Sequence, residues 1–420
     1  MPSPEALRLR CLALWAFGAG IFLWLPALAI LPASFPLQPL DLWVLAGWPL
    51  ALWCLPLCPP AILWIVALHL SSTLLSSAFT GATSLLALGH SALFATGALL
   101  LFAQICTHTL SRTAFLTGFG FAAIAMTVLA LAQFAFGADS LDFRSNTTFR
   151  LPPHTGRAFA LFPEVSTLAT HLLLAALIAF TIPHRASWIA GFGFMATLAL
   201  TQSTVALLIA PPALLAAGAL HGLDLRRISA LGIALISVAA IFWLTFYTPR
   251  WENGAALRSG AMRLASVLGA FGPLASGDWF GAGLGQNGAV TAHAYAIASR
   301  LGLQFAQVPQ GINSHLATRL FEEGLPALFL MITGGHFFLR AWRHDSLRFD
   351  AVQRSLLLLA LGSLLSGGFV TGYRTIYTNW LWLAFPAGLL AAGYSPSARQ
   401  ITAQVRSKIP KSRRNEMSRR

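Results

Sequence analysis

The sequence predicts an all-α fold: a polytopic, integral membrane bundle of about twelve transmembrane helices, with one large outer loop between the ninth and the tenth. Three observations lead to this prediction. Of the 420 residues, 56% are apolar and only 10% are charged, whereas soluble domains have about 25% charged residues. Apolar runs close to the length of a bilayer-crossing helix recur along the chain. Arginines are concentrated in alternate connections between these runs, which is the positive-inside pattern.

Each expected span is an apolar run bounded by polar, glycine or proline residues. The runs at 42–56, 187–200 and 378–393 are short, and two prolines inside 187–220 leave open that this stretch is one broken helix. The spans are expected at 11–32, 42–56, 61–78, 84–106, 113–136, 165–182, 187–200, 204–220, 229–248, 320–339, 353–370 and 378–393.

The distribution of arginines between the connections predicts that both termini are cytoplasmic. The first span is not followed by a convincing small-residue cleavage site, so we expect it to be retained rather than cleaved as a signal peptide. The inner connections carry Arg112, Arg185, Arg226, Arg227, Arg340, Arg343 and Arg348. The chain then divides into residues 1–248 with nine spans and a smaller outer loop at 137–164, a large periplasmic loop at 249–319, three spans within 320–393, and a basic tail at 394–420. The tail has no interleaved aromatic residues, so we expect it to contact anionic lipids rather than nucleic acid.

The two long outer loops contain more arginines than acids, against the positive-inside trend. A solvated surface is one explanation for any single arginine. The collective excess favours an anionic ligand on the outer side, because the planar guanidinium binds phosphate through two hydrogen bonds. These arginines are Arg144, Arg150, Arg157, Arg250, Arg258, Arg263, Arg300 and Arg319.

Ionisable residues lead directly into one apolar helix in QGINSHLATRLFEEGLPALFL, residues 310–330. On a helix, His315, Arg319 and Glu322 share one face because they lie at i, i+4 and i+7. We expect this face at the outer membrane boundary. The alternative is a helix-end ion-pair ladder, with Arg319 neutralised by Glu322 or Glu323.

A second polar segment, RAFALFPEVSTLATHLLL, covers residues 157–174. Arg157 approaches the membrane, Pro163 breaks the chain, and Glu164 begins the next span with Ser166 as a nearby cap. The alternative for Glu164 is stabilisation of a helix N-terminus, worth about 0.3–1 kcal/mol.

The remaining histidines, cysteines and glycines predict structural roles. We interpret the histidines in the spans as interhelical hydrogen-bonding groups and the cysteines as small core residues, neither disulfide-bonded nor metal-bound. The G-x-G-x-x-G pattern at 283–288 follows no strand of a parallel sheet, so it does not indicate dinucleotide binding. We expect no metal and no cofactor. The residues concerned are His69, His90, His171, His336, Cys11, Cys54, Cys58 and Cys106.

Together, these segments resemble the O-antigen polymerase and O-antigen ligase superfamily of bacterial envelopes. The similar parts are R-x-x-x-x-F-P-E-x-S-x-x-A from Arg157 to Ala169, the outer-loop stretch RSGAMRLASVLGAFGPLASGDWFGAGLG, and NSHLATRLFEEGLPALFLM. The first part lacks the proline of the Glu-Pro-Ser element of exopolysaccharide polymerases. Ligases carry a His-Asn pair about nine positions before the glutamate, where this chain has Asn313. That departure favours the polymerase.

The resemblance implies a metal-independent glycosyltransferase in the bacterial inner membrane. It would join undecaprenyl-pyrophosphate-linked repeat units to a growing glycan on the outer face, in exopolysaccharide or O-antigen biosynthesis. A chain-length regulator is an optional further partner. For this reaction we expect Glu164 or His315 to act as the catalytic base, and Asn313 and Glu322 to lie on the acceptor side. We assign the pyrophosphate to Arg157, Arg258 and Arg263, with Arg319 and Arg374 as second-tier candidates.

Three alternatives remain. The first is an O-antigen ligase that transfers glycan to lipid A-core. The second is a flippase or secondary transporter for a lipid-linked glycan, although transporters concentrate polar residues at the membrane midplane. The third is a structural membrane subunit, which would leave the outer arginine excess unexplained.

Overall fold

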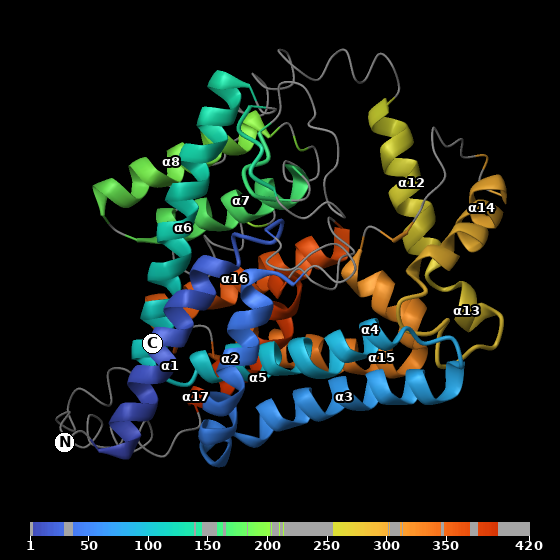
Figure 1. Cartoon of the computed structure of the whole chain (residues 1–420), viewed down its shortest axis with the longest axis horizontal. Coiled ribbons are helices and arrows are strands. Elements are labelled where there is room, and N and C mark those ends of the chain that lie inside the picture. Colours follow the sequence, from blue (N-terminus) through green and yellow to red (C-terminus); the bar gives the residue numbers. More distant parts are fainter. Residues whose placement is uncertain are drawn as a thin grey trace, which may run out of the picture.

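The computed structural model consists of helices joined by short connections, and no strand occurs among the residues that it describes. The predicted all-helical fold is therefore confirmed for this part of the chain (Figure 1). The described residues are 3–28, 37–137, 140–144, 158–162, 165–182, 184–201, 203, 210, 213, 255–300, 302, 311–312, 314–345, 348–369 and 377–393.

Five of the described helices are long and apolar enough to cross a membrane, which supports a membrane-embedded protein. Two shorter apolar helices accompany them, Pro39–Cys54 and Val165–Phe180. The predicted spans at 204–220 and 229–248 lie outside the described residues, apart from positions 210 and 213. The five long helices are Pro60–Thr80, Leu85–Ile105, Thr109–Phe136, His315–Arg343 and Ala351–Gly368.

The N-terminal helix α1 (Pro4–Phe22) differs from the predicted span at 11–32 because it starts and ends earlier. Its start is set by the Ser3 hydroxyl, which accepts a hydrogen bond from the backbone N–H of Ala6. Pro26 lies a few residues beyond its end and cannot continue a helix. α1 packs along α6 (Thr109–Phe136), and a Cβ on Gly118 would lie 2.1 Å from the Phe17 carbonyl. Small residues thus allow the two backbones to approach closely.

Three of the described helices are buried along nearly their whole length. Every residue of α5 (Thr96–Ile105) is buried, as are residues 381–391 of α17 (Leu381–Gly393) and residues 165–180 of α7 (Val165–Thr181). α2 (Pro39–Cys54) and α3 (Pro60–Thr80) pack on α5, and α15 (His315–Arg340) and α16 (Ala351–Phe369) pack on α17. α8 (Arg185–Leu200) packs on α7.

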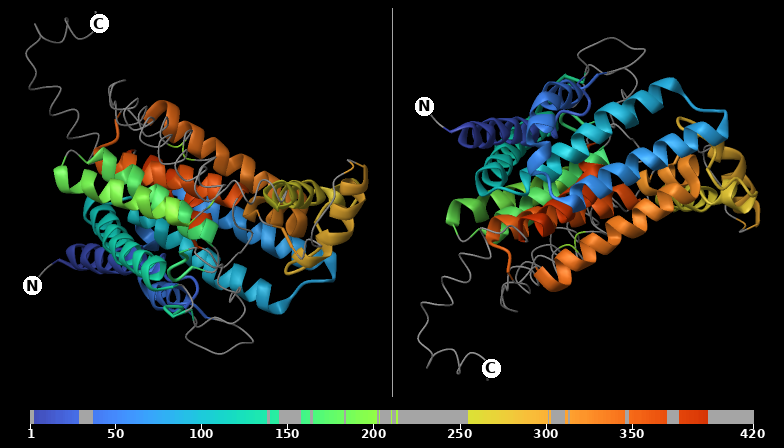
Figure 2. Two further views of the ribbon diagram at one scale, coloured as in Figure 1. Left: turned by 90° about the horizontal axis from the view of Figure 1, so that it is seen from above. Right: turned by 90° about the horizontal axis from the view of Figure 1, so that it is seen from below.

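The described helices of the predicted outer loop gather at one end of the bundle (Figure 2). They are α12 (Ala255–Gly269), α13 (Gly272–Ala275) and α14 (Val290–Arg300). The connection between α13 and α14 contacts the turn that joins α3 to α4 (Leu85–Gly89). There the Ser84 N–H donates to the Leu284 carbonyl at 2.8 Å. This end of the bundle also contains the first turns of α15.

Candidate functional site

The polar first half of α15 is buried in the bundle. Ser314 caps the helix, because its hydroxyl accepts a hydrogen bond from the Ala317 N–H at 3.1 Å. The exposed fractions of the four ionisable side chains are 0% for His315, 2% for Arg319, 1% for Glu322 and 0% for Glu323. Charged residues are almost never fully buried without partners. Their contacts therefore define what this site can do.

Arg319 and Glu323 form an ion pair one helical turn apart, with 2.5 Å between Nη2 and Oε2. Arg319 Nε donates to the other carboxylate oxygen at 3.1 Å, which completes a two-pronged contact. The Ser72 hydroxyl of α3 donates to Glu323 Oε2. The Arg319 guanidinium also lies over the Trp380 ring, 4.9 Å from its centroid. Of the two acids that the sequence offers Arg319, Glu323 is the ion-pair partner.

Glu322 instead binds the outer-loop connection. Its Oε1 accepts hydrogen bonds from the backbone N–H groups of Gly285 and Asn287, both at 3.1 Å. The G-x-G-x-x-G segment thus surrounds a carboxylate of the same chain. This contact attaches the outer loop to the start of α15.

α15 is broken immediately after these acids, at Gly324, whose φ of 63° and ψ of −137° are not helical. The break leaves backbone carbonyls without hydrogen-bond partners in the helix, and groups from neighbouring segments donate hydrogen bonds to them. The Ala282 N–H donates to the Phe321 carbonyl at 2.8 Å, and the Ser76 hydroxyl donates to the Glu322 carbonyl at 2.7 Å. A Cβ at Gly324 would lie 2.3 Å from the Trp279 carbonyl oxygen. Glycine is therefore needed both for conformation and for space.

Trp380 connects three parts of this site. It belongs to the 3₁₀ turn η7 (Tyr377–Trp380), which precedes α17, and is 0% exposed. Its ring packs edge-on against His315, with centroids 4.7 Å apart, and against His69 of α3, with centroids 5.0 Å apart. With Arg319 over the same ring, the indole fixes the position of the polar face of α15 relative to α3.

The structure brings together only some of the predicted site residues. His315, Arg319 and Glu322 lie on one helix. Arg263 lies on α12 and is partly exposed; α12 packs on α14, and its Val267 joins a hydrophobic cluster with Ala317 and Phe321 of α15. Arg258 is also on α12, and only its backbone is described. Arg157, Glu164, Asn313 and Arg374 lie outside the described residues.

Several buried residues with polar groups were not predicted. Ser72 and Ser76 of α3 and Trp380 of η7 contact α15, whereas Tyr377 of η7 and Asp41 at the start of α2 contact each other. A signal for two of them is present in the sequence. His69, Ser72 and Ser76 lie at i, i+3 and i+7 in an otherwise apolar helix, which places a polar stripe on one face.

The predictions for the histidines are partly confirmed. His69 Nε2 lies 3.1 Å from the Ser91 carbonyl, a hydrogen bond between α3 and the next helical segment. For His171 the prediction of an interhelical hydrogen bond is wrong, because its Nδ1 contacts the Thr167 carbonyl of its own helix at 2.9 Å. Its ring packs instead against Trp24 and Phe162. Within the described parts of the chain, no three His, Cys, Asp or Glu side chains come together as metal ligands.

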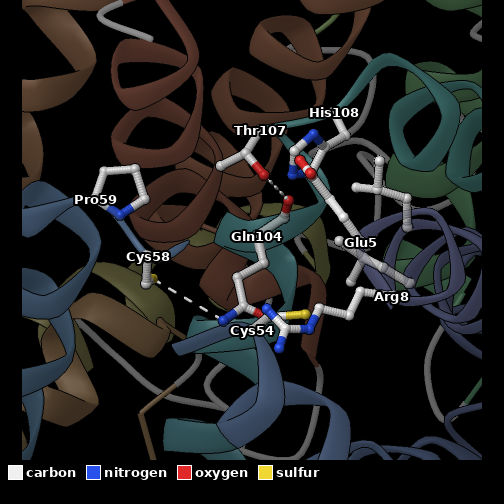
Figure 3. A pocket seen from close by; sticks show the side chains of 10 residues that line it. Glu5, Arg8, Cys54, Cys58, Pro59, Gln104, Thr107 and His108 are labelled. Carbon is white, nitrogen blue, oxygen red and sulfur yellow. Dashed lines mark hydrogen bonds between the residues drawn. The ribbon is translucent and has the colours of Figure 1, made fainter. Parts of the chain in front are cut away.

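A small pocket lies near the N-terminus, between α1, the end of α2 and the connection after α5 (Figure 3). Its lining includes Cys54, Cys58, His108, Glu5 and Arg8. Burial raises the pKa of the Cys58 thiol to about 11, and the Gln104 amide opposes this shift. Burial, helped by Arg112, lowers the pKa of His108, whereas Glu5 opposes this shift. At neutral pH the Cys58 thiol is therefore protonated and His108 uncharged, which does not favour nucleophilic chemistry here.

An apolar groove of about 410 Å³ lies between α6, α7, α8 and α16. It is lined by side chains such as Leu116, Ile124, Ile178 and Phe194, and by Val352 in the first turn of α16. The contact with the α15 site lies at the other end of α16, where the Ser314 hydroxyl donates to the Gly367 carbonyl. About 22 Å separates Val352 from Gly367 along the helix axis.

Neither a family model nor a curated protein matches this chain.

Proposed function

We propose that this protein is a polysaccharide polymerase of the bacterial inner membrane, with about twelve spans and both termini in the cytoplasm. It joins undecaprenyl-pyrophosphate-linked repeat units on the outer face. The observation that carries the proposal is the group of four ionisable side chains at the start of α15 inside an apolar bundle. Burying ionisable side chains inside a membrane-embedded bundle costs free energy, and such residues usually serve a function. The expected outer-loop arginines supply the anion-binding groups that this chemistry requires.

The reaction forms a bond between an acceptor hydroxyl oxygen and the anomeric carbon of the donor sugar. The bond between that carbon and the pyrophosphate oxygen breaks, and the lipid pyrophosphate leaves with the electron pair. Arg157, Arg258 and Arg263 stabilise this negative charge, with Arg319 and Arg374 as secondary candidates. Because Glu323 already pairs with Arg319, we rank the outer-loop arginines first.

The acceptor hydroxyl must lose its proton to a base within hydrogen-bond reach. His315 and Glu164 are the candidates, and His315 is positioned by the Trp380 ring. Asn313 and Glu322 are assigned to the acceptor side, where Glu322 attaches the outer loop to α15.

The apolar groove supports a lipid-linked substrate. It lies about 22 Å along α16 from the end of the bundle that holds the outer-loop helices and the start of α15, which is less than the roughly 30 Å thickness of a hydrocarbon core. A long isoprenoid chain whose pyrophosphate is bound at that end can therefore extend to the groove.

The test is polymerisation in proteoliposomes with a defined lipid-linked repeat unit. We expect His315→Ala and Glu164→Gln each to lower the rate of polymer formation by about 10²–10⁴, the usual effect of losing a general base. The matched control is His336→Ala, which removes an exposed histidine from the same helix. If both variants form wild-type polymer at equal protein level, the proposed catalytic roles are wrong. If the wild type forms none from an authentic repeat unit, the polymerase proposal is wrong.

The break at Gly324 favours a second candidate, a lipid-linked-glycan flippase. Broken helices that carry buried charges form the substrate sites of many transporters. The same vesicles distinguish the two functions, because a flippase would move the labelled donor across the bilayer without lengthening it. A ligase, the remaining alternative, would consume the donor only after a lipid A-core acceptor is added.

A further inference from the structure

A second buried polar cluster lies apart from the α15 acids and is not used by the proposed reaction. Asp41, at the start of α2, is 1% exposed. Its Oδ2 accepts the Gln38 backbone N–H at 2.7 Å, and its Oδ1 accepts the Tyr377 hydroxyl. His90 Nε2 lies 3.6 Å from the same Oδ1. We refer to Asp41, His90 and Tyr377 as the Asp41 cluster.

His90 is also the first residue of a π-helical segment, η2 (His90–Ala95), between α4 and α5. Such segments are rare and are found frequently at functional sites. The widened backbone makes the Ser91 carbonyl available to two side chains, His69 Nε2 and the Thr96 hydroxyl, each at 3.1 Å. His90 is 4% exposed, and within the described residues neither of its ring nitrogens makes a hydrogen bond.

Among the described residues, His90 is the group that makes an ion-pair contact with Asp41. α5 and α17, which pack nearby, carry no titratable side chain. α3 contributes His69, whose Nε2 is engaged by the Ser91 carbonyl. α15 contributes His315 and the Arg319–Glu323 pair beyond Trp380, and that pair is neutral as a unit. It also contributes Glu322, whose carboxylate accepts two backbone N–H groups of the outer loop. The charged side chain of α16, Arg354, lies in its first turn, at the other end of that helix.

We propose that the Asp41 cluster is a proton-binding site in the interior of the bundle. The bound proton lies on His90 Nε2, beside the Asp41 carboxylate. This pair is neutral overall, and loss of the proton leaves one negative charge in an apolar environment. This site is independent of glycan transfer and would serve any activity that needs a proton inside the bundle.

Proton uptake at this site is linked to helix geometry. The 3.6 Å between His90 Nε2 and Asp41 Oδ1 is an ion-pair distance and is longer than a hydrogen bond. A movement of less than about 1 Å would convert it into a charge-assisted hydrogen bond. Because His90 begins the π-helical segment, that movement would draw η2 towards α2.

The test is the thermal unfolding of the purified full chain in nanodiscs between about pH 5 and pH 8, the range in which histidine changes charge. The charged ring balances Asp41 only in the folded chain. We therefore expect the melting temperature of the wild type to rise relative to that of His90→Gln as the pH falls, by about 2 °C or more across the range. Asp41→Asn should remove the same pH dependence. His336→Gln, which removes an exposed histidine from α15, should follow the wild type at a constant offset.

Parallel curves for the wild type and His90→Gln would overturn the proposal. If His90→Gln does not fold, Tyr377→Phe provides the second test, because it removes only the hydroxyl that donates to Asp41. The pH at which the wild-type curve bends must then move in Tyr377→Phe. An unmoved curve would equally overturn the proposal.

Discussion

Ser72 of α3 and Glu323 of α15 are joined by a hydrogen bond of 2.5 Å between Oγ and Oε2, although 251 positions separate them in the chain. This contact connects the polar face of α15 to the helix beside it. It also gives the buried Glu323 carboxylate a second partner besides Arg319.

Ser72→Ala should therefore lower the stability of the folded chain. A hydrogen bond to a charged group contributes about 1.5–3 kcal/mol. The matched control is Ser77→Ala, because among the described residues the Ser77 hydroxyl bonds only within its own helix, to the Thr73 carbonyl at 2.8 Å. Thermal unfolding in detergent measures the difference, and equal melting temperatures for the two variants would contradict it.

Removing one member of the buried ion pair should destabilise the folded chain more than removing both members. Arg319→Met leaves Glu323 as an unpaired buried charge, which costs about 3–5 kcal/mol. The double variant Arg319→Met/Glu323→Leu restores much of this stability, because no charge then remains buried. A double-mutant cycle of unfolding free energies measures the coupling. Additive losses would show that the two side chains do not depend on each other.

Gly324→Ala should disturb the contact between α15 and the outer loop. The added Cβ would lie 2.3 Å from the Trp279 carbonyl oxygen, and φ is 63°. Such strained conformations cost about 1–3 kcal/mol before the clash is included. Gly335→Ala is the matched control in the same helix, where a Cβ meets no atom within 4 Å. There alanine should be neutral or stabilising by up to about 1 kcal/mol.

Hydrogen exchange across 279–287 gives a local measurement of the same change. We expect faster exchange there in Gly324→Ala and unchanged exchange in Gly335→Ala.

Arginine-to-lysine substitution tests the proposed pyrophosphate contacts. A lysine keeps the charge of Arg157 or Arg263 but cannot reproduce the planar, two-pronged hydrogen bonding. Both lysine variants should therefore lose polymer output at equal protein level. Arg300→Lys, at the exposed end of α14, serves as the control. Normal output from Arg157→Lys and Arg263→Lys would place both residues on a solvated surface.

Topology can be tested with reporter fusions. An alkaline phosphatase fused near Thr291 should be active, because the predicted layout puts the loop containing α14 outside the cytoplasm. A fusion after Ser395 should be inactive, because the C-terminus is expected to be cytoplasmic. The reverse pattern would contradict the proposed orientation and, with it, a reaction on the outer face.

The sequence by itself determined the helical class and most of the element positions. Long apolar runs bounded by breakers have one low-energy solution in a bilayer, so α3, α6 and α16 follow closely from hydropathy. The spacing of His315, Arg319 and Glu322 likewise fixed their common helix, because the 3.6-residue period is local information.

Only the tertiary structure decided which partners these side chains take. Arg319 had two acids within one turn, and the choice of Glu323 depends on Ser72 and Trp380, which are remote in sequence. The Gly285 and Asn287 N–H groups donate hydrogen bonds to Glu322. The break in α15 at Gly324 lies against that same loop. Asp41, His90 and Tyr377 come from three separate segments and show no shared pattern along the chain. Their association depends on how the helices pack, and packing is not encoded in any single window of residues.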